Sequence, residues 1–354
     1  MNHSSSRSGA LPSRGGAWAW RVLALVAASL TVQCGSPNTP TPPPPPPPAL
    51  TLTCPAAVEA HSTDGNPRPV QYEAPQAAGG VAPVSISCSV ASGAAFSVGT
   101  TNVLCSATDA RGSSAFCSFN VRVIAPPRLA YTRYLAFGDS ITWGVDSPRV
   151  PALTALLAPE PPPAHSYPNR LRERLAERYP QQSISMLNAG IPGEYAANIP
   201  GQQSGVRRFR DVLLTYNPEV VLLMEGTNDL LGGQNGADAA IAALDAMIAE
   251  ARARDRRVCL ATIPPQRPNG VRNRAAVAAL IPGFNDRIRA LAADRGVILV
   301  DVFNAMNNDL RLIGVDDLHP TVEGFQVIAD TFLAAIAANL QEAQPAIAPA
   351  AAVE

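Results

Sequence analysis

The second part of the chain alternates between two hydrophobic periodicities. Short apolar runs of strand length are separated by longer segments in which apolar residues recur every three or four positions. The apolar runs cover residues 134–140, 183–190, 219–229, 256–265 and 297–303. The helical segments cover residues 167–179, 206–216, 237–255, 281–296 and 321–340. Strands that alternate with helices form a parallel sheet covered by helices on both faces, so residues 130–342 are predicted to form an α/β domain.

Residues 50–126 follow a different pattern, of short alternating segments broken by Gly, Asn and Pro. Apolar residues alternate along residues 103–107, a turn is expected at 109–112, and the alternation returns along residues 117–123. Short strands with frequent turns are typical of a small all-β sandwich.

Four of the chain's 6 cysteines lie in this predicted sandwich, at Cys54, Cys88, Cys105 and Cys117. A domain of this size gains stability from disulfides, and four cysteines allow three pairings, which the sequence leaves open. Their spacing does not resemble a zinc-ligand pair. Outside the predicted sandwich, Cys259 lies within an apolar run and is expected to be a small buried apolar residue.

The N-terminal residues 1–34 have the pattern of an export signal. Three arginines precede an apolar run at residues 22–32, which is too short to span a membrane, and Cys34 follows it. Cys34 after such a run resembles a bacterial lipobox, although Gln33 departs from the small residue usual before that cysteine. The sequence predicts an exported protein, either a lipoprotein of the cell envelope (periplasm or cell surface) anchored through Cys34 or an ordinary secreted protein.

Proline and alanine mark the remaining segments. Residues 35–49 contain seven consecutive prolines, which favour an extended polyproline II linker. Residues 343–354 are rich in Ala and Pro and are expected to be disordered. Residues 146–168, also rich in proline, are interpreted either as a wall of a pocket or as a solvent-facing loop.

Composition excludes some partners. The formal net charge of the 354-residue chain is −1, and no basic stripe suggests binding to nucleic acid. The hydrophobic content of 47% is that of an ordinary globular protein, with room for two or three domains. The oligomeric state is not determined by the sequence.

Polar residues gather where the predicted strands end. Residues 138–140, 188–190 and 226–229 follow the first three apolar runs, and residues 316–319 follow the fifth and precede the last helix. In an open parallel sheet the carboxyl ends of the strands share one edge, where ligands bind. These residues are therefore expected to form one site.

A serine becomes nucleophilic beside a general base, usually a histidine oriented by a carboxylate. Of the chain's 4 histidines, only His319 has an acidic residue at a favourable spacing, which is Asp316. Asp317 is the alternative carboxylate. Ser140 is the expected nucleophile, and it is also expected to cap the helix that follows the first strand. Acyl transfer further needs hydrogen-bond donors for an oxyanion, for which the Ser140 amide, a glycine amide after the second strand and the Asn228 side chain are candidates.

Residues 134–342 resemble the SGNH or GDSL hydrolase family of esterases and lipases. The resemblance rests on four sequence blocks, FGDSIT, NAGIPGE, GTND and DDLH, and no G-x-S-x-G elbow occurs. The family implies a three-layer α/β/α fold with a flavodoxin-like strand order and no metal or organic cofactor. It also implies an oxyanion donor at Gly193, with Gly190 as the alternative.

Residues 50–126 resemble a hyalin repeat, an immunoglobulin-like module. The resemblance rests on Cys54-Pro55, the run F-x-V-G-T-T-x-V-x-C at residues 96–105, the A-T-D-x-x-G turn and the C-x-F-x-V segment that follows. It implies an adhesive or spacer role and no catalytic residues.

Together the patterns predict an exported serine esterase that acts on a small-molecule or polysaccharide ester, such as an acetyl ester of a carbohydrate. A lipid acyl hydrolase of the lysophospholipase or thioesterase type is an alternative. An alternative of another class is a surface adhesin whose hydrolase-like domain is not catalytic.

Overall fold

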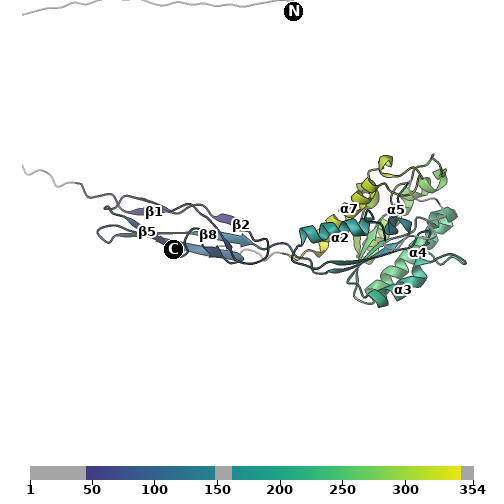
Figure 1. Ribbon diagram of the computed structural model, residues 1–354, viewed down its shortest axis with the longest axis horizontal. Helices are drawn as coiled ribbons and strands as arrows, with labels where there is room; N and C mark the ends of the chain where they lie inside the picture. The colour runs from purple at the N-terminus through teal and green to yellow at the C-terminus, as the bar shows by residue number, and fades with distance from the viewer. Residues whose placement is uncertain (1–44, 148–161, 344–354) are drawn as a thin grey trace, which may run out of the picture. The chain divides into compact units, whose positions relative to one another are not determined.

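The five apolar runs form one parallel sheet in the computed structural model, which describes residues 45–147 and 162–343 (Figure 1). Its strands are β9 (Arg133–Gly138), β10 (Ser185–Gly190), β11 (Val220–Met224), β12 (Arg257–Ala261) and β13 (Ile298–Val300). They lie side by side in the order β10-β9-β11-β12-β13, and every neighbouring pair is parallel. This is the flavodoxin-like order, so the predicted fold is confirmed.

Helices cover both faces of this sheet. One face packs against α2 (Tyr167–Arg178) and α7 (Val322–Leu340), where the rings of Tyr167 and Phe332 stack at 5.0 Å. The other face packs against α3 (Gly205–Tyr216), α4 (Gly233–Arg252) and α5 (Ala275–Arg295). Figure 1 shows α2 and α7 on the side of the sheet opposite α3 and α4. The strands alternate accordingly, since Tyr134 and Ala136 face the first layer whereas Leu135 and Phe137 face the second.

Two predicted helices have other boundaries in the structure. The helix expected over residues 237–255 begins at Gly233 and ends at Arg252. The helix expected over residues 281–296 begins at Ala275, and Pro282 lies inside it. Proline favours the first turn of a helix, which is why the pattern placed the start near Pro282. Burial of Val277, Ile281 and Phe284 in one core holds the helix together across the proline.

The strand order reverses between β9 and β11, and this point lies at the centre of the sheet. The two strands approach closely at their carboxyl ends. A Cβ at Gly138 would lie 2.4 Å from the carbonyl oxygen of Met224 and 2.0 Å from Oγ1 of Thr142, so only glycine fits there. The loops after β9 and β11 lead to helices on opposite faces of the sheet, α2 and α4, and doubly wound sheets bind ligands at such a point.

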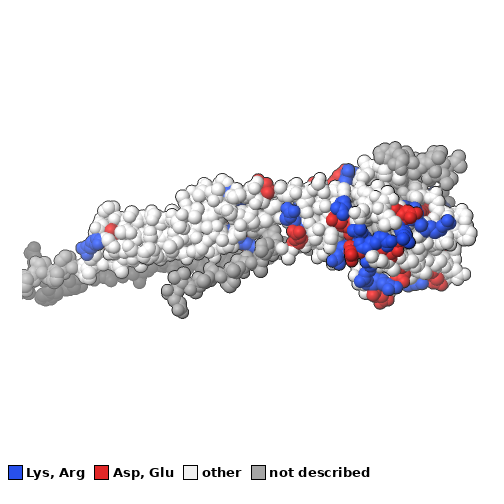
Figure 2. Space-filling model, turned by 90° about the horizontal axis from the view of Figure 1, so that it is seen from below, with Lys and Arg blue, Asp and Glu red and all other residues white. Residues whose placement is uncertain are grey.

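Residues 51–124 form a small all-β domain, as predicted. Its main sheet has the order β2-β8-β7-β5, in which only the β2–β8 pair is parallel. Those strands are β2 (Val58–His61), β5 (Ser85–Cys88), β7 (Gly99–Thr108) and β8 (Ser114–Ile124), and the smaller pairs are β1 (Thr51–Thr53) with β4 (Gln76–Ala78) and β3 (Arg68–Pro69) with β6 (Ala95–Phe96). Val103, Phe119 and Val121 fill the core, as the alternation predicts. Figure 2 shows few charged side chains on the visible face of this domain.

Two disulfides cross-link the all-β domain. Cys54 pairs with Cys117, and Cys88 pairs with Cys105, its register partner on the neighbouring strand. The structure therefore selects one of the three pairings that the sequence left open. Cys259, in β12, is fully buried and unpaired, and burial raises the pKa of its thiol to about 12, as fits a small apolar residue.

Several sequence predictions fall outside the described residues. They are the export signal with Cys34, most of the Pro-rich linker, residues 148–161 of the proline-rich segment and nearly all of the C-terminal tail. Within residues 45–147 and 162–343, no helix combines the length and apolar character needed to cross a bilayer.

The disulfides give a testable order of stabilities. The Cys54–Cys117 bond closes a sequence separation of 63 residues and the Cys88–Cys105 bond one of 17. Because a longer loop loses more unfolded-state entropy on closure, replacing the first pair by serines should lower the free energy of unfolding of this domain by about 4 kcal/mol, and replacing the second by about 3 kcal/mol. Denaturant-dependent hydrogen exchange of the β7 and β8 amides measures this, with the β11 amides as an internal control. Unchanged exchange in both variants would contradict the expectation.

Candidate active site

Ser140 stands at the start of a short helix directly after β9. The helix is α1 (Ser140–Trp143), and its N-cap is Asp139, whose Oδ1 accepts a hydrogen bond of 2.8 Å from the amide of Ile141. The expectation that Ser140 caps this helix was therefore wrong. Asp139 is the better cap because its carboxylate reaches the second amide of the helix while its neighbour occupies the first helical position. The Ser140 hydroxyl is left to another partner.

That partner is His319. Its Nε2 lies 2.9 Å from Oγ of Ser140, and its Nδ1 lies 2.5 Å from Oδ2 of Asp316. Ser140 and His319 are 5% and 6% exposed, which leaves a narrow contact with solvent. The structure thus brings together the three predicted residues from opposite ends of the domain sequence, in one chain of hydrogen bonds.

Asp316 is held as an ionised carboxylate. Burial alone would raise its pKa, but the hydrogen bond and charge of the His319 ring, with backbone hydrogen bonds from His319 and Leu318, hold its pKa well below the ordinary value. Oδ1 accepts those backbone bonds at 3.0 and 3.2 Å. An ionised Asp316 can accept the Nδ1 proton of His319 and fix the ring so that Nε2 faces Ser140.

Asp317, the alternative carboxylate, binds the loop after β12 instead of His319. Its backbone is left-handed, with a φ of 70°, and its side chain is fully buried. Oδ2 accepts a 2.7 Å hydrogen bond from the amide of Arg272, and Oδ1 lies 3.6 Å from Arg267. The structure therefore places Asp316, and not Asp317, beside His319.

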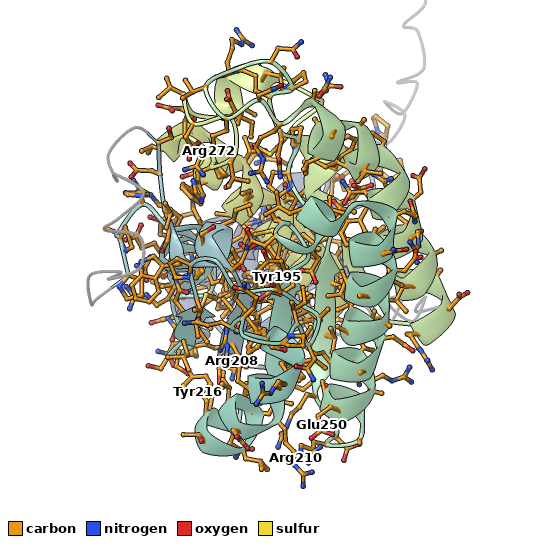
Figure 3. The ribbon with its side chains drawn as sticks, turned by 90° about the vertical axis from the view of Figure 1, so that its right-hand side faces the viewer. Tyr195, Arg208, Arg210, Tyr216, Glu250 and Arg272 are labelled. Atoms are coloured by element: carbon orange, nitrogen blue, oxygen red, sulfur yellow. A yellow bond between two sulfur atoms is a disulfide. The ribbon has the colours of Figure 1, made fainter. Side chains whose placement is uncertain are left out.

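Sequence reasoning missed the contacts that the loop after β12 and residue Ser147 make with Asp316. Arg272, on that loop, lies 3.5 Å from Oδ2 of Asp316, and the Asp316 amide donates a 2.9 Å hydrogen bond to Oγ of Ser147. Arg272 lies in the loop after β12 and Tyr195 in the loop after β10, and both loops begin at the carboxyl edge of the sheet (Figure 3). Arg272 and Ser147 are far from Asp316 in the sequence, so no motif spacing predicts their contacts with it.

Asn228 follows β11 at the carboxyl edge of the sheet. Its Nδ2 donates a 2.7 Å hydrogen bond to the carbonyl oxygen of Glu194, and the residue is partly exposed. An amide nitrogen carries two hydrogens, so one remains for a further acceptor. The bond to Glu194 fixes the direction in which that second hydrogen points.

The two candidate glycines differ in what surrounds them. The amide of Gly190 donates to Oδ1 of Asn188 at 3.0 Å, and a Cβ at Gly190 would lie 2.2 Å from the amide nitrogen of Trp143. Gly193 is exposed, has a φ of 80°, and its amide has no acceptor among the residues that the structure describes. This geometry favours Gly193 as the glycine whose amide can bind a ligand.

The loop after β10 is also tied to Asp229. The carboxylate oxygens of Asp229 accept hydrogen bonds of 2.8 and 3.0 Å from the amides of Ala196 and Ala197. Asn228 and Asp229 therefore bind the same loop at adjacent points, and the loop that carries Gly193 is held against the end of β11.

Buried acidic side chains lie beneath this loop. Asp139, Glu194, Glu225 and Asp229 are at most 1% exposed. Burial raises the pKa of Asp139 to about 7, and burial with the neighbouring charges of Asp139 and Glu194 raises that of Glu225 well above its ordinary range. These residues lie next to the motifs in the sequence, but the sequence does not indicate that their carboxyl groups are neighbours in the fold.

Comparison with known proteins agrees with the fold and the motifs. Residues 136–327, more than half of the chain, match the model of the GDSL-like lipase/acylhydrolase family, and residues 45–123 match that of the HYR domain. Both resemblances inferred from the sequence are confirmed. A search of the curated proteins found no match.

Solved structures include several esterases. The native aryl esterase of M. smegmatis is 18% identical with a TM-score of 0.50, and the match covers 59% of this chain and 100% of that one. A carbohydrate acetylesterase from Sinorhizobium meliloti is 17% identical with a TM-score of 0.49, covering 58% and 99%. An acetylxylan esterase from Geobacillus stearothermophilus is 23% identical with a TM-score of 0.43, covering 59% and 95%. At these identities the similarity concerns the fold.

The raised pKa of Asp139 predicts a pH-dependent effect of replacing it. Between its ordinary pKa of 3.8 and its folded-state value of about 7, the unfolded chain loses the Asp139 proton while the folded chain keeps it. Stability from this group is therefore present below pH 4 and lost as the pH rises to 7. Asp139→Asn keeps an oxygen for the cap and does not titrate, so the variant should gain on the order of 3 kcal/mol over the wild type between pH 4 and 8. Denaturant unfolding at both pH values measures this gain, and an equal difference at both would contradict it.

Proposed function

Because the chain belongs to the GDSL-like lipase/acylhydrolase family and is thus a hydrolase of ester bonds, we propose that Ser140, His319 and Asp316 carry out the hydrolysis. The Ser140 oxygen bonds to the ester carbonyl carbon as its proton passes to Nε2 of His319. His319 then gives that proton to the leaving alcohol oxygen as the carbon–oxygen bond breaks. Water attacks the acyl-enzyme in the same way, which releases the acid and restores the Ser140 hydroxyl.

Three donors stabilise the oxyanion in this proposal. They are the backbone amides of Ser140 and Gly193 and the side-chain amide of Asn228. The Ser140 and Gly193 amides have no acceptor among the described residues, and Asn228 keeps one hydrogen free of its bond to Glu194. Donors of this kind, fixed before the substrate arrives, are each worth about 3 to 4 kcal/mol in the transition state.

One observation carries the proposal. The hydrogen-bonded chain from Oγ of Ser140 through His319 to Asp316, with lengths of 2.9 and 2.5 Å, lies at the carboxyl edge of the sheet, where the strand order reverses. A serine that only ended a strand would need no histidine at its hydroxyl. A histidine that only filled the core would need no ionised carboxylate behind it.

For the substrate, we propose a carboxylic ester that reaches the enzyme from outside the cell, with an acetyl ester of a carbohydrate as the first candidate. The exposed position of Gly193 and the partly exposed Asn228 support a shallow site that a polymer could approach. A lipid acyl hydrolase, of lysophospholipase or thioesterase type, is the second candidate.

We also propose export, with the protein either attached to the cell envelope through a lipid on Cys34 or secreted. The signal-like pattern of residues 1–34 supports export. The two disulfides of the all-β domain support the same compartment, because structural disulfides persist in oxidising surroundings. The HYR domain then acts as a spacer or an adhesive module.

Ser140→Ala should abolish cleavage of p-nitrophenyl acetate, with kcat lowered by at least about 1000-fold, because the nucleophile is lost. A fluorophosphonate probe should label wild-type Ser140 and leave the variant unlabelled. Ser166→Ala is a matched control, since Ser166 is also a buried serine and its hydroxyl has no hydrogen-bond partner within the described ranges. Failure of the probe to label the folded wild type would favour the non-catalytic adhesin.

The proposed substrate predicts no advantage for long acyl groups. The wild type should release acetate from acetylated xylan, and kcat/KM for p-nitrophenyl esters should show no rise from acetyl to octanoyl. A longer acyl chain gains about 0.8 kcal/mol for each methylene group that the enzyme buries, and a site adapted to acetyl esters buries none of the additional ones. The measurement is a series of p-nitrophenyl esters beside the polysaccharide. A rise in kcat/KM with chain length would favour the lipid acyl hydrolase instead.

A further inference from the structure

Glu225, which lies between β11 and Gly226, has a chemical environment that the hydrolysis itself does not explain. Its side chain is fully buried, and neither carboxyl oxygen has an N–H or O–H donor among the described residues. Burial raises the pKa of Glu225, and the charges of Asp139 and Glu194 and a hydrogen bond with the Glu194 carboxyl group raise it further. Burying an ionised carboxylate without a hydrogen-bond donor would cost several kcal/mol, so one of the two carboxyl groups is expected to be protonated.

Glu194 is the ionised member of the pair. It is fully buried, and Arg208 on α3 binds both of its oxygens, with Nε 2.6 Å from Oε1. Arg208 is fixed by two further contacts, a 2.7 Å hydrogen bond to the carbonyl oxygen of Ala189 and the ring of Phe137, whose centroid lies 4.0 Å away. A two-pronged bond of this kind is typical of an ionised carboxylate.

The groups around Glu225 favour its protonated form over its ionised form. Asp139 follows β9, Glu194 lies in the loop after β10, and Asp229 follows β11, and each opposes a negative charge on Glu225. Tyr167, on α2, supplies no positive charge. Arg208 supplies a positive charge to this cluster, but its guanidinium is paired with the Glu194 carboxylate. Two carboxyl groups in contact share a hydrogen bond only when one of them keeps its proton.

Glu194 connects this pair to the oxyanion donors. It is the residue after Gly193, and its carbonyl oxygen accepts the 2.7 Å hydrogen bond from the Asn228 side chain. A displacement of Glu194 would therefore move the Gly193 amide and release Asn228 together. Glu225 is in turn joined to Asn228 through two intervening residues, so the contact closes a ring between the two loops.

We propose that Glu225 is a positioning residue whose carboxylic acid donates a hydrogen bond to the Glu194 carboxylate and thereby holds Gly193 and Asn228 as oxyanion donors. The inference rests on the proposed function of that site. Ionisation of Glu225 would place a second negative charge against Glu194 and break the contact. The wild-type kcat should then fall at alkaline pH with little change in KM, because the donors act mainly in the transition state.

Glu225→Gln tests the proposal, because the amide still donates to Glu194 but does not titrate. The variant should keep kcat within about threefold of the wild type and should lose the alkaline fall in kcat. Glu225→Ala removes the donor and should lower kcat by about 100-fold, as a displacement of about 1 Å in a catalytic site does, with KM changed little. Glu250→Gln on α4, whose ion pairs lie with Arg210 and Arg254, is the matched control and should leave the pH profile unchanged (Figure 3).

A second measurement is spectroscopic. Infrared spectra of the wild type should show a carboxylic acid C=O band that is absent from Glu225→Gln and that disappears with rising pH at the same midpoint as kcat. An unchanged alkaline fall in Glu225→Gln, a fully active Glu225→Ala, or the absence of such a band would overturn the proposal. These outcomes are distinct from a failure of the proposed function, which would appear as activity retained in Ser140→Ala.

Discussion

The close approach of β9 and β11 at the centre of the sheet is the constraint on which the site depends. The two strands can run side by side to their ends only because Gly138 has no side chain to meet the carbonyl of Met224. Since the strand order reverses there, one loop leaves toward Ser140 and the other toward Asn228. The proposed nucleophile and a proposed oxyanion donor, from distant parts of the sequence, thus lie at one edge of the sheet.

Hydrogen bonds to backbone groups then turn this proximity into a fixed geometry. Asp139 caps α1, Asp316 accepts two amides of its own turn, and Asp229 binds two amides of the loop after β10. In each case an acidic side chain binds the main chain of a loop at the candidate site. Loops held in this way can carry reactive side chains with little loss of order, because the orphan amides of short turns are satisfied.

The sequence predicted the elements better than their connections. Hydrophobic patterning located all five strands, of which β9, β11 and β12 are buried almost throughout, and motif spacing located Ser140, Asn228 and the pair of Asp316 and His319. It misplaced the start of α5, where core packing outweighs the local preference of Pro282. Contacts between residues far apart in the chain, such as that of Arg272 with Asp316, have no periodic signature, and the disulfide pairing depends on strand register in the same way.

The two halves of the site make opposite electrostatic demands. In the proposed hydrolysis His319 gains a positive charge, and an ionised Asp316 beside it lowers the energy of that state. The proposed oxyanion would form on the other side, near a cluster of buried carboxyl groups, and each charge there would oppose it more strongly than in water. Arg208 cancels the charge of Glu194, and burial keeps the proton on Glu225. Acidic residues can therefore lie beside both His319 and the oxyanion donors, because the surroundings of each carboxyl group determine whether it is charged.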